Sequence, residues 1–377
     1  MADHPLPDIV LPASLRPSDG RFGSGPAKVR QEAVTALAEA APGFLGTSHR
    51  QVPVKSLVRR LREGLAHLFS LPDGYDVALG NGGATAFWDV ATCCLVERRS
   101  QHLSFGEFSA KFAAAVAAAP HLEHPEVLES APGTHPSAVA SPDVDLYALT
   151  HNETSTGVAM DVVRPDGAGP GSLVAVDATS AAGGLRVDPA QFDAYYFAPQ
   201  KCFASDGGLW LALLSPAAVE RAERLARASR WVPPSLDLVV ALSNSRLDQT
   251  YNTPALATLF LLVNQVEWML AGGGLVWAAG RCDRSAEHLY GWAEASPYAS
   301  PFVAKPDERS HVVGTVDLDA SVEAAVVTGV LRANGIVDTE AYRRLGRNQL
   351  RVAMYPAVEP DDVAALTACI DHIVEHL

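Results

Sequence analysis

Two stretches of the sequence decide the fold. They read Leu173-Val-Ala-Val-Asp-Ala-Thr-Ser180 and Ala194-Tyr-Tyr-Phe-Ala-Pro-Gln-Lys-Cys-Phe203. Each opens with a short apolar run that is typical of a buried strand and then turns polar, at Asp177 in the first stretch and at Lys201 in the second. Because ligands bind at the carboxyl ends of strands in open α/β sheets, the pair predicts a ligand site at the edge where the two strands end.

The segments around these strands repeat the same rhythm. Short apolar runs, each long enough for one strand, are separated by helix-like or turn segments. The runs cover residues 75–79, 102–105, 146–150, 173–176, 194–198 and 208–214. Strands that alternate with helical segments are typical of a parallel sheet with crossover helices. We therefore expect an α/β fold with a mostly parallel central sheet.

The N-terminal region predicts an arm followed by helices. Residues 1–26 are rich in proline and predict an irregular arm. A helix is expected over residues 27–40, where Pro42 and Gly43 end it, and a second one over residues 53–69.

The C-terminal region predicts a second, smaller unit. A long helix is expected from about 254 to 270, and three glycines at 272–274 then break the pattern. The remaining chain predicts a fresh helix, strands at 310–317 and 349–354, and a terminal helix. The expected division is an arm (1–26), a large domain (27–270) and a small α+β domain (271–377).

The composition argues against some classes of partner. The 377 residues carry a formal net charge of −14, so we expect neither nucleic acid nor an anionic membrane, both of which need a basic face. The five cysteines are odd in number and lack metal-site spacing, which favours reduced thiols in a cytoplasmic protein and no metal site. We also expect no signal peptide and no membrane span, because no run of about 18 apolar residues occurs.

Lys201 and Asp177 are the candidate catalytic residues. A lysine at the end of an apolar strand is partly desolvated, which lowers the pKa of its amine and makes it nucleophilic, as a Schiff-base lysine requires. The alternative is a lysine that reaches from the strand end to solvent. Asp177 suits a carboxylate that pairs with a pyridinium nitrogen, although an aspartate in this position often only caps the next turn.

The stretch Gly80-Asn-Gly-Gly-Ala-Thr85 follows a predicted strand and opens a predicted helix. Free backbone N–H groups at such a helix start bind phosphate, although a plain glycine turn is the alternative. The stretch matches neither the dinucleotide fingerprint nor the P-loop, which argues against a dinucleotide or ATP. Phe108 could stack on a cofactor ring, although an aromatic residue after a strand more often packs in the core. Thr154 could donate a hydrogen bond to an oxygen on such a ring, and a structural role in a turn is the alternative.

Arginines are the candidate substrate ligands. Arg351 stands alone among apolar residues on a predicted strand, so it needs an anionic partner, which is either a substrate carboxylate or an internal acid. Arg50 follows His49 in a loop, and Arg343 and Arg344 lie in the loop before Arg351.

Taken in order, these motifs resemble those of the phosphoserine aminotransferases, and most closely the actinobacterial branch of that family. The resemblance spans nearly the whole chain. The motifs that carry it are Phe22-Gly-Ser-Gly-Pro26, Ser48-His-Arg50, Asn152-Glu-Thr154, Asp177-Ala-Thr-Ser180, Ala198-Pro-Gln-Lys201, Tyr251-Asn-Thr-Pro254 and Leu350-Arg-Val-Ala-Met354. The resemblance implies a fold-type I transferase with pyridoxal 5′-phosphate as its cofactor.

The resemblance also implies a role for each matching cofactor residue. Lys201 would carry the cofactor as a Schiff base and move protons, and Asp177 would hold the ring nitrogen. Phe108 would stack on the ring, and Thr154 would contact the ring hydroxyl. The implied phosphate ligands are Gly83, Ala84, Thr85 and Gln200, together with Asn252 and Thr253 of the neighbouring subunit in a homodimer with shared sites.

For the substrates, the resemblance implies that Arg351 holds the α-carboxylate and that His49 and Arg50 bind the distal anion. The implied reaction is ping-pong transamination from glutamate to 3-phosphohydroxypyruvate, in serine and pyridoxine synthesis. Many members have an arginine where Ala84 stands and a His-Arg pair in the loop before Arg351. Here that loop reads Tyr342-Arg-Arg-Leu-Gly-Arg-Asn348, so Arg344 is expected at the substrate, with Arg343 and Arg347 as alternatives.

Two other functions remain open at this point. One is a different fold-type I enzyme, such as an alanine–glyoxylate aminotransferase or a cysteine desulfurase. A desulfurase usually has histidine where Phe108 and Gln200 stand, which argues against it. The other is a non-catalytic binding protein of the same fold, against which the presence of both Lys201 and Asp177 argues.

Overall fold

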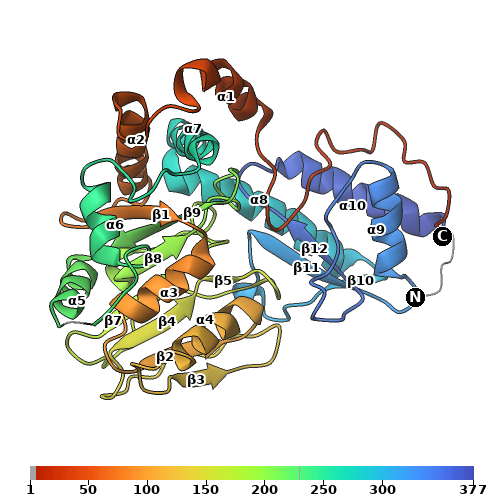
Figure 1. The fold of residues 1–377 in the computed structure, drawn as a ribbon. Coiled ribbons are helices and arrows are strands. Elements are labelled where there is room, and N and C mark those ends of the chain that lie inside the picture. The colour runs from red at the N-terminus through yellow and green to blue at the C-terminus, as the bar shows by residue number, and fades with distance from the viewer. Residues whose placement is uncertain (1–5, 229) are drawn as a thin grey trace.

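A seven-stranded sheet forms the centre of the computed structural model, which describes residues 6–228 and 230–377 (Figure 1). The strand order is β1-β9-β8-β7-β4-β2-β3. The bounds are β1 (Asp76–Asn81), β2 (Ser100–Ser104), β3 (Glu126–Glu129), β4 (Leu146–Thr150), β7 (Leu173–Asp177), β8 (Ala194–Phe197) and β9 (Leu209–Leu214). Strand β9 pairs antiparallel with β1 and β8, and the other pairs in the sheet are parallel. The expected mostly parallel α/β sheet is therefore confirmed.

The strands are apolar because helices bury both faces of the sheet. On β8, Tyr195 and Phe197 belong to one core, whereas Ala194 and Tyr196 belong to the other. The first core takes residues from α2 (Val52–Leu68) and α7 (Leu256–Gly272), next to α1 (Gln31–Phe44). The second takes residues from α3 (Ala84–Cys94), α4 (Glu107–Ala117), α5 (Pro216–Arg227) and α6 (Leu238–Ser245). A two-stranded hairpin, β5 (Asn152–Glu153) with β6 (Val158–Ala159), follows β4.

The limits predicted for the first helix are wrong. Helix α1 begins at Gln31 rather than near residue 27, and Pro42 lies inside it. Its start is delayed because the backbone N–H of Ala27 donates to Gln200 O (2.8 Å), which keeps the preceding segment extended along the loop that carries Lys201. Pro42 is tolerated because it falls in the last turn, where its missing N–H costs a single helical hydrogen bond.

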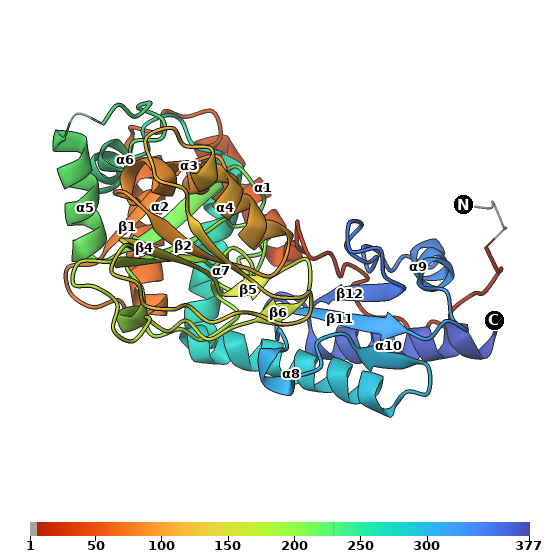
Figure 2. The ribbon, with the colours of Figure 1, turned by 90° about the horizontal axis from the view of Figure 1, so that it is seen from below.

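The C-terminal part is a smaller α+β unit that lies beside the large sheet (Figure 2). Its antiparallel sheet has the order β10-β11-β12. The bounds are α8 (Gly274–Ala295), β10 (Ala299–Pro301), β11 (Val313–Leu318), α9 (Ala324–Ala333), β12 (Gln349–Ala353) and α10 (Pro360–Glu375). Leu11 and Phe22 of the N-terminal segment pack into its core. The segment before residue 23 therefore packs as part of the small unit, while the exact domain limits stay a prediction.

Helices α7 and α8 meet at the predicted glycine break. They cross at 89°, and Gly273 between them has φ +124°, a conformation that favours glycine. Within the described ranges, no single helix is long and apolar enough to cross a membrane. Among the described helices, α7 and α8 taken together across this bend meet this condition by length and composition alone.

Candidate active site

A cavity of about 330 Å³ opens where β4, β7 and β8 end and α3 begins. Residues from each predicted cofactor motif of one chain line it. They are Gly83, Ala84, Thr85, Phe108, Thr154, Asp177, Gln200 and Lys201. Asn252 and Thr253, which we expected to act from a neighbouring subunit, are not among the lining residues. The fold thus joins segments that are far apart in the sequence into one concave site.

Lys201 lies four residues beyond the end of β8 and is 8% exposed. Burial and, to a smaller extent, the nearby positive charge of Arg351 together lower the pKa of its amine to about 8. Its Nζ donates to Ser24 O (2.6 Å), on the segment that crosses the site ahead of α1. A Cβ at Gly25 would clash with this Nζ, so glycine is required for the close approach of the two segments.

Asp177 is the last residue of β7 and is 5% exposed. Burial raises the pKa of its carboxyl, whereas hydrogen bonds from Thr179 and Trp88 act in the opposite direction. The Oδ1 atom accepts from the backbone N–H of Thr179 (3.0 Å) and from Thr179 Oγ1 (2.6 Å), and Oδ2 accepts from Trp88 Nε1 (2.8 Å). Strand geometry and three donors therefore hold the carboxylate at the floor of the cavity.

The glycine turn before α3 provides a second fixed element of the cavity. Helix α3 begins at Ala84 with Gly83 as its N-cap, and Gly82 has φ +119°. The first backbone N–H groups of a helix have no partner within the helix, and the helix dipole is positive at this end. The N–H groups of Gly83, Ala84 and Thr85 therefore form a site for an anion such as phosphate.

Phe108 and Thr154 lie on another side of the cavity. The ring centroid of Phe108 is 5.9 Å from Lys201 Nζ. The backbone N–H of Phe108 donates to Glu153 Oε2 (3.1 Å), so the fully buried Glu153 carboxylate fixes the first turn of α4. Thr154 Oγ1 donates to Ser180 Oγ (2.9 Å). The neighbouring strand-end residues thus set the position of both side chains.

Arg351 on β12 reaches the same region from the small unit. Its Nη1 donates to Thr154 O (3.3 Å), and its guanidinium lies 5.3 Å from the ring centroid of Tyr342. Its Nε is buried and has no hydrogen-bond partner within the described ranges, and burial lowers the pKa of the guanidinium. Among the residues that the structure describes, no carboxylate lies within 4.0 Å of it. The internal ion pair that was the alternative for Arg351 is thus not found in the described part of the chain.

The loop before β12 contains three arginines with different partners. Arg347 pairs with Asp317 and lies 4.6 Å from the ring centroid of Phe302, and Arg344 pairs with Glu107 at the start of α4. Arg343 is exposed, and no ion pair of it is found in the described ranges. The expected substrate residue Arg344 therefore forms an ion pair with Glu107 at the rim of the site and does not line the cavity.

His49, Arg50, Asn252 and Thr253 gather in a separate place. His49 Nδ1 lies 3.1 Å from Thr253 Oγ1, and Arg50 Nη1 donates to Gln249 Oε1 (2.5 Å). Arg50, Asn252 and Thr253 are exposed, and Nε2 of His49 has no hydrogen-bond partner in the described part of the chain. Together these four residues form what we call the loop cluster. It does not line the cavity of its own chain.

Comparison with known proteins identifies the family. The model of the class-V aminotransferases matches residues 22–365. A Mycobacterium leprae chain named as a candidate phosphoserine aminotransferase is 61% identical over 377 residues, which cover 100% of both chains. A Nocardioides phosphoserine aminotransferase is 60% identical over 370 residues, covering 98% of this chain and 99% of that one.

The chain belongs to the class-V aminotransferases. A solved phosphoserine aminotransferase from Cytophaga hutchinsonii has the same fold, with a TM-score of 0.84, 24% identity, and coverage of 94% of this chain and 99% of that chain. The expected fold-type I architecture is thereby confirmed. The protein is a transaminase whose cofactor is pyridoxal phosphate, as the sequence predicted.

The cavity of this aminotransferase suits that cofactor. An ionised carboxylate offers about four acceptor positions. Three on Asp177 are filled, which leaves one on Oδ2 for a ring N–H. The free N–H groups at the start of α3 suit the phosphate, and the buried Nζ of Lys201 suits the aldehyde. Asn152 and Gln200 line the same cavity, and their buried Oδ1 and Oε1 atoms have no hydrogen-bond partner among the residues that the structure describes.

Sequence reasoning missed several residues of the aminotransferase site. Trp88, Thr150, Thr179 and Ser180 line the cavity, and Ser24 O holds Lys201. Thr179 and Ser180 lie in a quoted motif and could have been named. Nothing in the sequence indicated that Trp88 lies at the site, because a tryptophan on an amphipathic helix ordinarily packs in the core.

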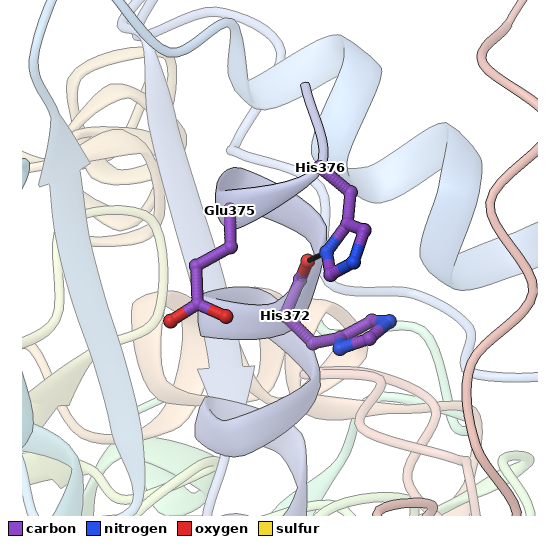
Figure 3. A group of neighbouring side chains, drawn as sticks. All are labelled: His372, Glu375 and His376. Atoms are coloured by element: carbon purple, nitrogen blue, oxygen red, sulfur yellow. Dashed lines mark hydrogen bonds between the residues drawn. The ribbon is translucent and has the colours of Figure 1, made fainter.

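One group of possible metal ligands occurs among the described residues, and it lies outside this site. His372, Glu375 and His376 stand at the C-terminal end of α10, with donor atoms within 4.8 Å of one another (Figure 3). His376 Nδ1 lies 2.7 Å from His372 O, and Glu375 and His376 are exposed. The group shares no residue with the cofactor cavity.

Proposed function

We propose that this chain is a phosphoserine aminotransferase that moves the amino group of L-glutamate to 3-phosphohydroxypyruvate, giving 2-oxoglutarate and O-phospho-L-serine for serine synthesis. The observation that carries the proposal is the 60% identity, over nearly the full length, to a chain named phosphoserine aminotransferase. The chemistry of the site agrees with it. Both substrates carry an α-carboxylate and a distal anion, so one set of cationic side chains suits both halves of the reaction.

In this mechanism Arg351 binds the α-carboxylate. Its side chain is half-buried and lies on the small-unit side of the site, and its buried Nε has no hydrogen-bond partner among the described residues. A bound carboxylate would satisfy that donor and offset the cost of burying the charge. Fixing the carboxylate also turns the α-carbon toward Lys201, whose amine is already close enough to Arg351 for the positive charge to lower its pKa.

Lys201 and Asp177 carry out the proton chemistry. Pyridoxal phosphate, when bound, supplies an electron sink for the charge that develops at the substrate α-carbon. Lys201 Nζ would pass the proton of the donor α-carbon to the carbon that bears the cofactor aldehyde, and would pass it on to the α-carbon of the acceptor in the second half. Its pKa of about 8 suits this role near neutral pH. Asp177 keeps the ring nitrogen protonated from the floor of the cavity.

The loop cluster of a second subunit binds the distal anion of the substrate, and Arg343 or Arg344 at the rim of the site also contacts this anion. In one chain the residues of the loop cluster do not line the cavity, although they match the family motifs for cofactor and substrate. Apolar residues are exposed on the segments that flank it, namely Val34, Leu45, Val52, Leu247 and Tyr251. This exposed apolar surface lies beside residues that match the family's site motifs but do not line the cavity of their own chain. Both features support a homodimer with shared sites.

We place the enzyme in the cytoplasm. All five cysteines are free thiols, and four of them are buried. Reduced cysteines suit a reducing compartment.

The test is a half-reaction with the purified, cofactor-loaded protein. Adding O-phosphoserine should convert the absorbance band of the aldehyde form of the cofactor to that of the amine form, at concentrations where alanine and cysteine leave it unchanged. Conversion by alanine or cysteine alone would overturn the phosphoserine assignment and keep the aminotransferase. A protein that binds no pyridoxal phosphate would contradict the family chemistry itself.

A further inference from the structure

Trp88 is a buried residue of the cofactor cavity that lies outside the family motifs. It lies on α3, is 5% exposed and lines the cavity. Its indole N–H donates to Asp177 Oδ2 (2.8 Å). The residue thus touches the carboxylate to which the ring nitrogen of the cofactor is assigned.

Packing leaves the indole little freedom. Its ring stacks on Phe112 of α4, with ring centroids 6.3 Å apart and planes at 17°. Phe112 in turn packs edge-on against Tyr196, which pairs with Asp177 in the sheet. A hydrogen bond from a donor held in this way fixes the direction of its acceptor as well as its charge.

The position of Trp88 on the helix is also informative. It follows Ala84 by four residues, and residues four apart share one face of a helix. The start of α3 therefore carries the phosphate-binding N–H groups, while the next turn carries the donor to Asp177. One rigid element links the two ends of the cofactor site.

We propose that Trp88 is a positioning residue, which together with Thr179 holds the Asp177 carboxylate so that one lone pair of Oδ2 is left to face the ring nitrogen of the cofactor. Thr179 fills both acceptor positions of Oδ1, and Trp88 fills one position of Oδ2. The inference rests on the role assigned to Asp177 and is independent of which amino acid is the substrate.

Two consequences follow from this arrangement. Without the indole N–H, the Asp177 carboxylate loses one of its three donors and can rotate away from the ring nitrogen. The ring nitrogen then holds its proton less firmly. When the ring carries less positive charge, the pKa of the nitrogen that joins Lys201 to the cofactor rises. That nitrogen then stays protonated to higher pH.

The experiment compares Trp88→Phe with Trp210→Phe. Trp210 is 2% exposed in the same hydrophobic core, so its replacement removes a similar volume without touching Asp177. For Trp88→Phe we expect the dissociation constant of pyridoxal phosphate to rise on the order of tenfold. The pH midpoint of the visible cofactor band should move upward. Trp210→Phe should keep the wild-type midpoint.

Trp88→His serves as a second variant, because it keeps a ring N–H on a smaller side chain. Its midpoint should lie between those of the wild type and Trp88→Phe. A wild-type midpoint and wild-type cofactor affinity in Trp88→Phe would overturn the proposal. Equal shifts in Trp88→Phe and Trp210→Phe would also overturn it, because loss of packing alone would then explain both. Since no readout uses phosphoserine, failure here is distinct from failure of the proposed function.

Discussion

At the scale of single residues, the pKa of Lys201 makes a testable prediction. Only the neutral amine attacks the aldehyde of the cofactor, and a pKa of about 8 leaves roughly one amine in ten neutral at pH 7. Covalent uptake of pyridoxal phosphate by the cofactor-free protein should therefore speed up with pH and level off above about 8. Arg351→Met removes a neighbouring positive charge, so it should raise the pKa of Lys201 and shift the midpoint to higher pH.

The measurement is the rate of appearance of the protein-bound cofactor band across pH. Arg347→Met is the matched control, because Arg347 pairs with Asp317 and is not among the groups that shift Lys201. A wild-type midpoint near the ordinary lysine value would contradict the prediction, as would a midpoint that Arg351→Met leaves unmoved.

At the scale of elements, the prediction concerns the turn before α3. Gly82 has φ +119°, and a Cβ there would meet the Cβ of Ala86 at 2.8 Å. Gly82→Ala should therefore cost about 1–2 kcal/mol of stability from backbone strain and also displace the first turn that faces the phosphate. Gly171→Ala is the control, since Gly171 has φ +86° with no atom within 4 Å of an added Cβ.

Thermal melting and the dissociation constant of pyridoxal phosphate separate the two effects. Both variants should melt at lower temperature than the wild type, by a few degrees. Only Gly82→Ala should lose cofactor affinity, on the order of tenfold. If Gly171→Ala lost as much affinity, general destabilisation would explain the result and α3 would have no special part in it.

At the scale of the whole molecule, the loop cluster predicts that each site is built from two chains. Lys201→Ala and Arg50→Ala should each be inactive as pure dimers. Mixed and refolded together, they should regain about one quarter of the wild-type activity, because half of the dimers are hybrids and each hybrid holds one intact site. If Arg50 acted in its own chain, no hybrid would contain an intact site, and the mixture would stay inactive.

The sequence alone predicted six of the seven strands of the central sheet, all except β3, and it placed Asp177 at the end of one strand and Lys201 just beyond the end of another. Those features depend on local patterns: a strand buried on both faces must be apolar, and its polar end then stands out. The resemblance to the family likewise predicted eight cofactor residues that line one cavity. For these residues, the local sequence pattern is sufficient to predict that they lie at the site.

Only the tertiary structure decided which distant segments meet at the site. Ser24 O holds Lys201, Trp88 donates to Asp177, and Arg344 turns to Glu107. The start of α1 was likewise set by a hydrogen bond to the loop that carries Lys201. Such contacts join residues tens to hundreds of positions apart, and their geometry follows from how helices and sheet pack. No periodicity within a single segment encodes that packing.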